Sequence, residues 1–383
     1  MAKRALKEFK YLEDWHNPNK KPYILIDQIS KSYSASDMAV NHVSLEIYKG
    51  EFFSLLGPSG CGKSTLLRIL AGLEKPDSGR ILIDGIDMTD YPPYKRPVNM
   101  MFQSYALFPH MTVAENVSFG LEQEKLLKST IKSRVDDILH LLKIEKFADR
   151  KPNQLSGGQR QRVALARCLI KKPKLVLLDE PLAALDKKLR EHTQFELVNI
   201  QEKIGVTFIM VTHDQEEAMT MSTRLGIMEE GRIRQVGTPK EVYEFPNSEY
   251  VADFIGTTNL FYGVVLEESS THTTVQSDEL KMPLYINHGG QVAVGSQVAV
   301  SLRPEKISIH IKKPKGKQNC APGIVKDIAY LGDVSIYYIQ IEPSKKLVLA
   351  TLPNFKRSET SPVTWNDRVY ISWKPENPVI LTA

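Results

Sequence analysis

Three short motifs in a fixed order constrain the fold of this chain more than any other feature. Residues 57–65 read GPSGCGKST, residues 155–159 read LSGGQ, and residues 175–180 read LVLLDE. The first matches G-x-x-x-x-G-K-[ST], a loop whose glycines let backbone N–H groups turn toward a phosphate. An apolar run at 51–56 precedes this loop, and a helical pattern at 65–73 follows it. A strand, a loop and a helix in this order predict an α/β sheet with an anion site at the helix N-terminus.

The phosphate loop supplies the first candidate binding residues. A lysine at its end offers a mobile charge to the outer phosphate oxygens of ATP, and the following serine hydroxyl suits Mg²⁺. One such charge about 4 Å from a phosphate oxygen is worth about 4 kcal/mol at an effective dielectric constant of about 20. We expect ATP contacts from Ser59, Gly60, Cys61, Gly62, Lys63, Ser64 and Thr65. Cys61 is a small residue that fits the loop, and its thiol would make the site sensitive to thiol reagents.

The LSGGQ motif predicts a second anion site. Residues 160–170 follow it with helical periodicity, so Ser156 is a candidate N-cap. The bare amides of Gly157 and Gly158 would add donors at the helix N-terminus. An ordinary helix cap with a glycine turn is the alternative; the QRQR that follows at once, and the short distance to the LVLLDE strand, favour the anion site.

Acidic and imidazole groups end two further apolar strands. Residues 175–178 are uninterruptedly apolar, which is typical of a strand buried on both faces, and Asp179 and Glu180 follow. Neighbours in an extended chain point to opposite sides, so Asp179 is expected to hold Mg²⁺ while Glu180 faces an attacking water. A second such strand, at 206–212, ends at His213. Ligands of open parallel sheets bind at strand-to-helix switches of this kind.

Together these motifs resemble those of ATP-binding-cassette (ABC) ATPases, specifically importer subunits, from about Pro22 to the C-terminus. In that family the phosphate loop of one protomer faces the LSGGQ motif of the other, so a head-to-tail homodimer encloses two ATP molecules. The resemblance implies that the signature residues Ser156, Gly157, Gly158 and Gln159 contact the partner's ATP. It also implies a loop that reaches across the dimer at Asp186, although Ala184 stands where most relatives have serine or glycine.

The same resemblance assigns the remaining site residues. Glu180 would be the general base or water-polarising group, and His213 would contact the γ-phosphate. Gln103 would touch both the attacking water and Mg²⁺, whose ligands would be Ser64, Gln103 and Asp179. Tyr33 would stack on adenine, a contact worth about 1–3 kcal/mol per base in nucleic-acid systems, unless it is an ordinary strand tyrosine.

Composition limits the class of protein. The chain has 383 residues, of which 42% are hydrophobic and 25% charged, as in an ordinary globular protein of two or three domains. A net charge of +5 is too small to indicate nucleic-acid binding. No run of 18 apolar residues and no apolar signal segment occur, so we expect a chain that stays in the cytoplasm. The resemblance to importer subunits implies that it lies peripherally on the cytoplasmic face of the cell inner membrane. Cys61, Cys168 and Cys320 are expected as free thiols.

The pattern along the chain divides it into regions. Residues 1–21 read as a basic arm, either solvated or in weak contact with anionic lipid. Residues 22–256 alternate strands and helices and predict an α/β P-loop cassette with a parallel sheet core, an antiparallel β subdomain and a helical subdomain at about 114–172. Residues 257–383 are short period-two strands between turns, which predict a small all-β barrel of the OB-like type.

The expected barrel resembles the regulatory (TOBE) domain of importer ATPases through LRPEKI at 302–307 and YLGD at 330–333. Two roles remain open for it: sensing of a small ligand or regulatory protein, or dimerisation without any ligand.

The resemblance implies an importer ATPase that works with two transmembrane permease subunits and, indirectly, a periplasmic solute-binding protein. Residues 104–112, which follow Gln103, would line a groove for a helix of the membrane subunit, or form a buried turn. Residues 92–113, 151–167 and 329–338 look most like the polyamine branch, in particular the ATPases of putrescine importers. Importers of spermidine, sugars, sulfate or ferric ion share nearly everything else and are the alternative.

Other classes fit less well. Chromosome-maintenance ATPases need a long coiled coil between the phosphate loop and LSGGQ, and here the two motifs are close in sequence. Ribosome-associated cassette proteins carry two cassettes, whereas this chain has a single phosphate loop. A standalone regulatory ATP-binding module is opposed by the intact Glu180 and His213, which favour hydrolysis.

Overall fold

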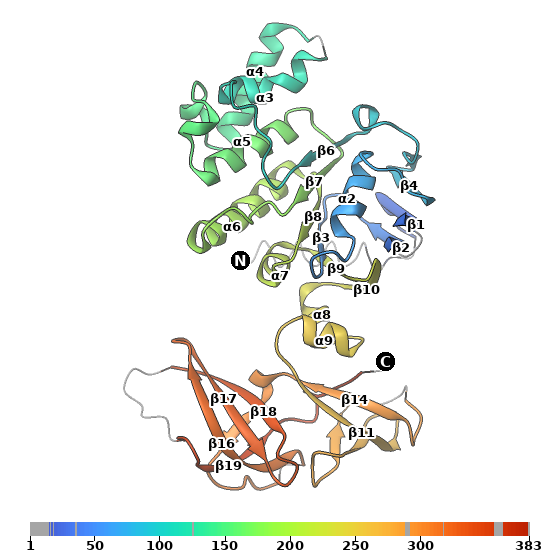
Figure 1. The fold of residues 1–383 in the computed structure, drawn as a ribbon, viewed down its shortest axis with the longest axis vertical. Coiled ribbons are helices and arrows are strands. Elements are labelled where there is room, and N and C mark those ends of the chain that lie inside the picture. Colours follow the sequence, from blue (N-terminus) through green and yellow to red (C-terminus); the bar gives the residue numbers. More distant parts are fainter. Residues whose placement is uncertain are drawn as a thin grey trace. The chain divides into compact units, whose positions relative to one another are not determined.

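The computed structural model describes residues 15, 17, 19–34, 37–124, 126–287, 292–316, 318–355 and 363–381. The chain forms two compact units, Met1–Pro239 and Lys240–Ala383 (Figure 1). Most of the basic arm expected at 1–21 lies outside the described residues. Among the helices that are described, none has the length and apolar character needed to cross a membrane.

The first unit is built on a six-stranded sheet in the order β10-β9-β3-β8-β7-β6. Five of its strands run parallel, and the edge strand β10 pairs antiparallel with β9. The strands are β3 (Phe52–Leu56), β6 (Val98–Met101), β7 (Leu175–Asp179), β8 (Thr207–Thr212), β9 (Arg224–Glu229) and β10 (Arg232–Gly237). Helices α2 (Lys63–Ala71), α6 (Lys187–Ile204) and α7 (Gln215–Met221) belong to the same unit. The parallel sheet core expected from the sequence is confirmed.

Alternate residues of the central strands enter two separate hydrophobic cores. Leu175 and Leu177 share a core with Leu66 of α2. Val176 and Leu178 share the other core with residues of the helical subdomain. A sheet covered on both faces needs an apolar side chain at every position, which is why LVLL shows no alternation.

Two smaller substructures complete the first unit. A four-stranded antiparallel sheet has the order β2-β1-β4-β5, with β1 (Ile24–Ser34), β2 (Asp37–Ile47), β4 (Ser78–Ile83) and β5 (Ile86–Asp87). The helical subdomain contains α3 (Val113–Glu122), α4 (Lys128–Leu141) and α5 (Gly157–Leu169). Figure 1 shows these three helices grouped together beside the sheet.

The second unit contains two five-stranded antiparallel sheets, β13-β12-β11-β14-β20 and β15-β19-β16-β17-β18. Buried side chains of both, among them Phe261 and Ile339, share one core. The expected all-β domain is therefore a pair of antiparallel half-barrels. Its strands are β11 (Asn259–Glu268), β12 (Thr273–Ser277), β13 (Leu284–Ile286), β14 (Gln297–Leu302), β15 (Ser308–His310), β16 (Cys320–Tyr330), β17 (Val334–Ile341), β18 (Leu347–Pro353), β19 (Arg368–Ser372) and β20 (Val379–Leu381).

Two short helices, α8 (Pro239–Glu244) and α9 (Glu249–Phe254), pack with this second unit. The buried Arg303 donates hydrogen bonds to the carbonyl oxygens of Ala252, at 2.8 Å, and Tyr243, at 3.2 Å. A buried guanidinium needs such acceptors. The second compact unit therefore begins earlier than the boundary at 257 expected from the sequence.

Candidate functional site

Four parallel strands end at one edge of the sheet, and each leads into residues expected in the site. The register pairs Leu56 with Thr212 and Met101 with Leu178. The phosphate loop, the glutamine segment, the acidic pair and the histidine therefore all leave the sheet at its carboxyl edge. Ligands of open α/β sheets bind at this edge.

Glycines allow the phosphate loop to lie against neighbouring backbone. A Cβ atom at Gly57 would lie 2.2 Å from the carbonyl oxygen of Met228, and one at Gly62 would lie 1.9 Å from that of Ala39. Gly62 also has a φ of 102° and caps α2 without any side-chain hydrogen bond. Gly60, in contrast, has open space around it. The first amides of α2 thus fit an incoming phosphate group.

Lys63 is buried, and its ammonium group contacts the loop itself. Nζ donates to the carbonyl oxygens of Gly57, at 2.8 Å, and Pro58, at 2.7 Å, and lies 3.4 Å from Sγ of Cys61. The carbonyl oxygen of Cys61 in turn accepts a hydrogen bond from the amide of Gly231, at 3.1 Å. The loop therefore holds a cation at the start of α2, where the first helix amides are donors for a phosphate.

Ser64 and Asp179 meet beside the loop. Oγ of Ser64 lies 3.2 Å from Oδ1 of Asp179. Burial raises the pKa of the Asp179 carboxyl; the hydrogen bond from Ser64 opposes this rise, and the nearby charge of Glu180 adds to it. Within the described residues no group of three His, Cys, Asp or Glu side chains is suited to hold a metal ion. One hydroxyl and one carboxylate fit Mg²⁺, which completes its octahedral shell with phosphates and waters.

Glu180 has partners of its own, on both carboxylate oxygens. Nδ1 of His213 lies 2.9 Å from Oε1, and Nε2 of Gln103 donates to Oε2 at 2.9 Å. The φ angle of Glu180 is 44°, in the left-handed region. Strand β7 ends at Asp179. The two carboxylates are therefore separated by this bend of the backbone. The sequence had suggested instead the alternation of side chains along an extended strand.

The signature residues begin helix α5. Oγ of Ser156 accepts from the amide of Gln159 at 3.4 Å, and Oε1 of Gln159 accepts from the amide of Ser156 at 2.9 Å. This reciprocal capping box follows from the S-x-x-Q spacing, a signal that our sequence analysis missed. In the described part of the chain, no hydrogen bond of residues 155–159 reaches the phosphate loop.

Tyr33 and Asp186 lie at the borders of the site. Tyr33 is 54% exposed near the end of β1, where the neighbouring Ser32 pairs with Met38 of β2. Nζ of Lys31 lies 5.8 Å from the centre of the Tyr33 ring. Asp186 caps α6 by accepting from the amide of Leu189 at 3.0 Å.

Arg190 connects two loops beside the candidate site, and sequence analysis missed it. Its Nη1 donates to Oδ2 of Asp214 at 3.1 Å, and its Nη2 donates to the carbonyl oxygen of Leu185 at 3.2 Å. The arginine thereby ties the loop before α6 to the turn after His213. Nothing in its sequence spacing distinguishes it from other helical arginines.

The segment 104–112 is held by hydrogen bonds to a buried asparagine. Oδ1 of Asn116 accepts from the amide of Phe108 at 2.8 Å, and its Nδ2 donates to the carbonyl oxygen of Thr112 at 2.9 Å. Tyr105 is buried, which agrees with the buried-turn alternative for that residue, whereas Phe108 is half-buried and packs on Phe119.

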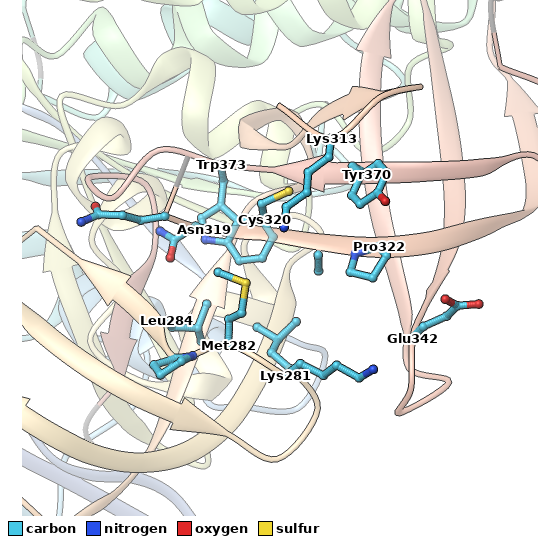
Figure 2. A pocket seen from close by; sticks show the side chains of 14 residues that line it. Lys281, Met282, Leu284, Lys313, Asn319, Cys320, Pro322, Glu342, Tyr370 and Trp373 are labelled. Atoms are coloured by element: carbon cyan, nitrogen blue, oxygen red, sulfur yellow. The ribbon is translucent and has the colours of Figure 1, made fainter. Parts of the chain in front are cut away.

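The second unit contains a separate pocket of about 300 Å³ (Figure 2). Its wall is mostly apolar and includes Met282, Leu284, Tyr370 and Trp373, while Lys281, Lys313 and Glu342 add charge. A cavity of this size holds a small molecule. Of the two roles left open for this domain, the pocket suits the sensing of a small ligand.

Comparisons with known proteins agree with this geometry. The family model described as "ABC transporter" matches residues 40–183, and the model described as "TOBE domain" matches residues 300–381. The Escherichia coli (strain K12) putrescine transport ATP-binding protein PotG is 52% identical over 362 residues, covering 94% of this chain and 96% of that protein. The spermidine/putrescine import ATP-binding protein PotA of Protochlamydia amoebophila (strain UWE25) is 47% identical, with coverage of 94% and 96%.

A solved structure shares the cassette fold. The dimeric ATP-binding cassette MJ0796, bound to ADP and Pi in a post-hydrolysis state, is 34% identical with a TM-score of 0.51, and covers 56% of this chain and 98% of that chain. The likeness to PotG and PotA spans nearly the whole chain, well beyond the cassette. This chain therefore belongs to the ATP-binding proteins of ABC transporters and carries a TOBE domain in its C-terminal part.

Proposed function

We propose that this chain is the ATP-hydrolysing subunit of a polyamine importer, with putrescine as the transported solute. The observation that carries the hydrolytic role is the convergence of Lys63, the Ser64–Asp179 pair and the Glu180–His213 pair at one sheet edge. The solute is supported by the relatives named for putrescine and spermidine transport, which match along nearly the whole chain.

ATP would be bound by the loop from Ser59 to Thr65, with Tyr33 stacked on the adenine. Lys63 would exchange its carbonyl partners for phosphate oxygens, which are stronger acceptors because they are charged. Ser64, Gln103 and Asp179 would hold Mg²⁺, which neutralises phosphate charge in the transition state.

Glu180 would accept a proton from the attacking water or orient that water. Its bonds to Gln103 and His213 hold the carboxylate in one place. His213 is bound through Nδ1, so Nε2 is left for the γ-phosphate. Loss of a positioned base typically costs about 10²–10⁴-fold in rate.

A second copy of the chain would complete each ATP site. The signature residues Ser156, Gly157, Gly158 and Gln159 would contact the partner's nucleotide, and the loop at Asp186 would reach across the dimer. The dimeric state of the related MJ0796 cassette supports this arrangement. The homodimer would bind two permease subunits at the cytoplasmic face of the inner membrane, and a periplasmic binding protein would select the solute.

The test is reconstitution of the chain with its co-purifying membrane partners in lipid vesicles. ATP hydrolysis is measured after adding binding proteins loaded with putrescine, spermidine, a sugar, sulfate or ferric ion. We expect the putrescine-loaded protein to stimulate hydrolysis most, and a Glu180→Gln complex to show no stimulation. Stimulation by only the sugar, sulfate or ferric-ion protein would refute the polyamine assignment.

A further inference from the structure

Two consecutive residues in the segment after Gln103 adopt an unfavourable backbone conformation. Tyr105 has a φ of 62° and Ala106 a φ of 45°, both in the left-handed region. Residues that carry a Cβ atom avoid this region because of steric conflict with the carbonyl oxygen. Such a turn persists only when the surrounding structure holds it.

Arg167 of helix α5 holds this turn by its carbonyl groups. Its Nη1 donates to the carbonyl oxygen of Ala106 at 2.7 Å, and its Nη2 donates to that of Tyr105 at 2.8 Å. The guanidinium also lies 5.4 Å from the ring centre of Phe108. The rigid, planar fork of arginine suits two adjacent acceptors, which a lysine cannot match.

The same turn is tied to the residue that follows Glu180. The hydroxyl of Tyr105 donates to the carbonyl oxygen of Pro181 at 3.3 Å. Nε2 of Gln161, also on α5, donates to that oxygen at 3.1 Å. Helix α5 therefore holds both the turn at 105–106 and the bend at Glu180.

We infer that Arg167 is a positioning residue for ATP hydrolysis: it holds the turn at 105–106 and thereby keeps the side chain of Gln103 on Glu180. The inference rests on the function proposed above, since it needs Gln103 and Glu180 to act at the reacting water. Because Ser156 of the signature motif caps α5, any shift of this helix would move Gln103 as well. Arg167 thus connects the signature motif with the hydrolytic group inside one chain.

Arg167→Met in the full-length chain tests the inference. The phosphate loop is untouched, so we expect the KM for ATP to stay within about twofold, while kcat falls by about 10–100-fold, as misplacement of a reacting group produces. Arg162→Met is the matched control on the same helix, because Arg162 pairs with Glu196 of α6 and not with the turn. Its kcat should stay within about twofold of the wild type. Equal kcat values for the Arg167→Met chain and the wild type would overturn the inference.

Two combined variants separate positioning from a general loss of structure. Ala106→Gly in the Arg167→Met background should restore part of kcat, since glycine adopts a positive φ without help. Arg167→Met should cost nothing further in a Gln103→Ala background, because both changes remove the same contact. Full additivity of the two losses, or absence of any rescue by Ala106→Gly, would overturn the inference.

Folding and the proposed site are checked separately. If Arg167→Met does not fold, Arg167→Lys keeps the charge without the fork and should give an intermediate kcat; a wild-type kcat would count against the inference. A wild-type kcat for Gln103→Ala would remove the proposed role of Gln103 and, with it, this inference. A slow Gln103→Ala chain beside a fast Arg167→Met chain would refute the role of Arg167 alone.

Discussion

Glu180 and His213, 33 residues apart, are joined by a 2.9 Å contact between Oε1 and Nδ1 at the carboxyl edge of the parallel sheet. The strands that directly precede them, β7 and β8, are neighbours, so sheet order brings the two groups together. Glu180 has a left-handed φ of 44°, and Asp179, the residue before it, contacts Ser64. This arrangement suits the proposed division of roles, in which Glu180 acts on the water and Asp179 and Ser64 hold the metal.

Glu180→Gln should retain ATP binding but lose hydrolysis by about 10²–10⁴-fold, because the amide keeps the shape of the carboxylate and lacks its charge. The variant should therefore accumulate as a closed dimer in ATP. Light scattering with and without ATP measures this state. A monomer in saturating ATP would contradict both the dimer and the role of Glu180.

Lys63→Ala should weaken nucleotide binding by at least about tenfold, because the loop loses its point charge, which is worth up to about 4 kcal/mol. Titration calorimetry with a slowly hydrolysed ATP analogue measures the affinity. Lys132→Ala, a change on the exposed face of α4, is the control and should bind normally. Unchanged affinity in the Lys63 variant would argue against the phosphate cradle.

Gly62→Ala should destabilise the fold by more than Gly60→Ala. A Cβ at Gly62 meets the carbonyl oxygen of Ala39 at 1.9 Å, whereas one at Gly60 meets nothing within 4 Å. Both positions have a positive φ, so both variants carry a backbone strain of about 1–2 kcal/mol. The clash adds to this strain only at Gly62. Thermal unfolding compares the two, and equal melting temperatures would contradict the close approach of β2 to the loop.

Asp179→Asn should raise the stability of the nucleotide-free protein at neutral pH. Burial raises the pKa of Asp179 above the unfolded value, so the folded state disfavours the ionised carboxyl. Below the unfolded pKa the carboxyl is protonated in both states and costs the fold nothing. As the pH rises through the folded pKa, the carboxyl ionises and the free energy of unfolding falls. The gain of the Asn variant should therefore shrink as the pH falls toward 4 and below, near the ordinary value of 3.8. Melting temperatures across this pH range, without Mg²⁺, give the comparison; a gain independent of pH would contradict the assignment.

The sequence alone determined the cassette fold, the parallel sheet and the family of this chain. These features rest on signals between near neighbours: the glycine spacing of the phosphate loop, the uninterrupted LVLL strand and the Ser156 cap. Each of these signals involves only a few consecutive residues, so each can be recognised without the tertiary structure. The site roles that the family resemblance assigned to Glu180, His213 and Gln103 stay predictions, to be tested by the variants above.

Only the tertiary structure decided which side chains hold these groups in place. Arg167 reaches carbonyl groups 61 and 62 residues away, and Gln161 reaches one 20 residues away. Arg303 binds α9 and α8 to the second unit through the carbonyl groups of residues that are 51 and 60 positions away in the sequence. A carbonyl oxygen is the same chemical group in every residue, so the sequence does not mark which one a distant arginine binds. Strand order, and backbone bends such as that at Glu180, determine which carbonyl oxygen lies within reach of the arginine.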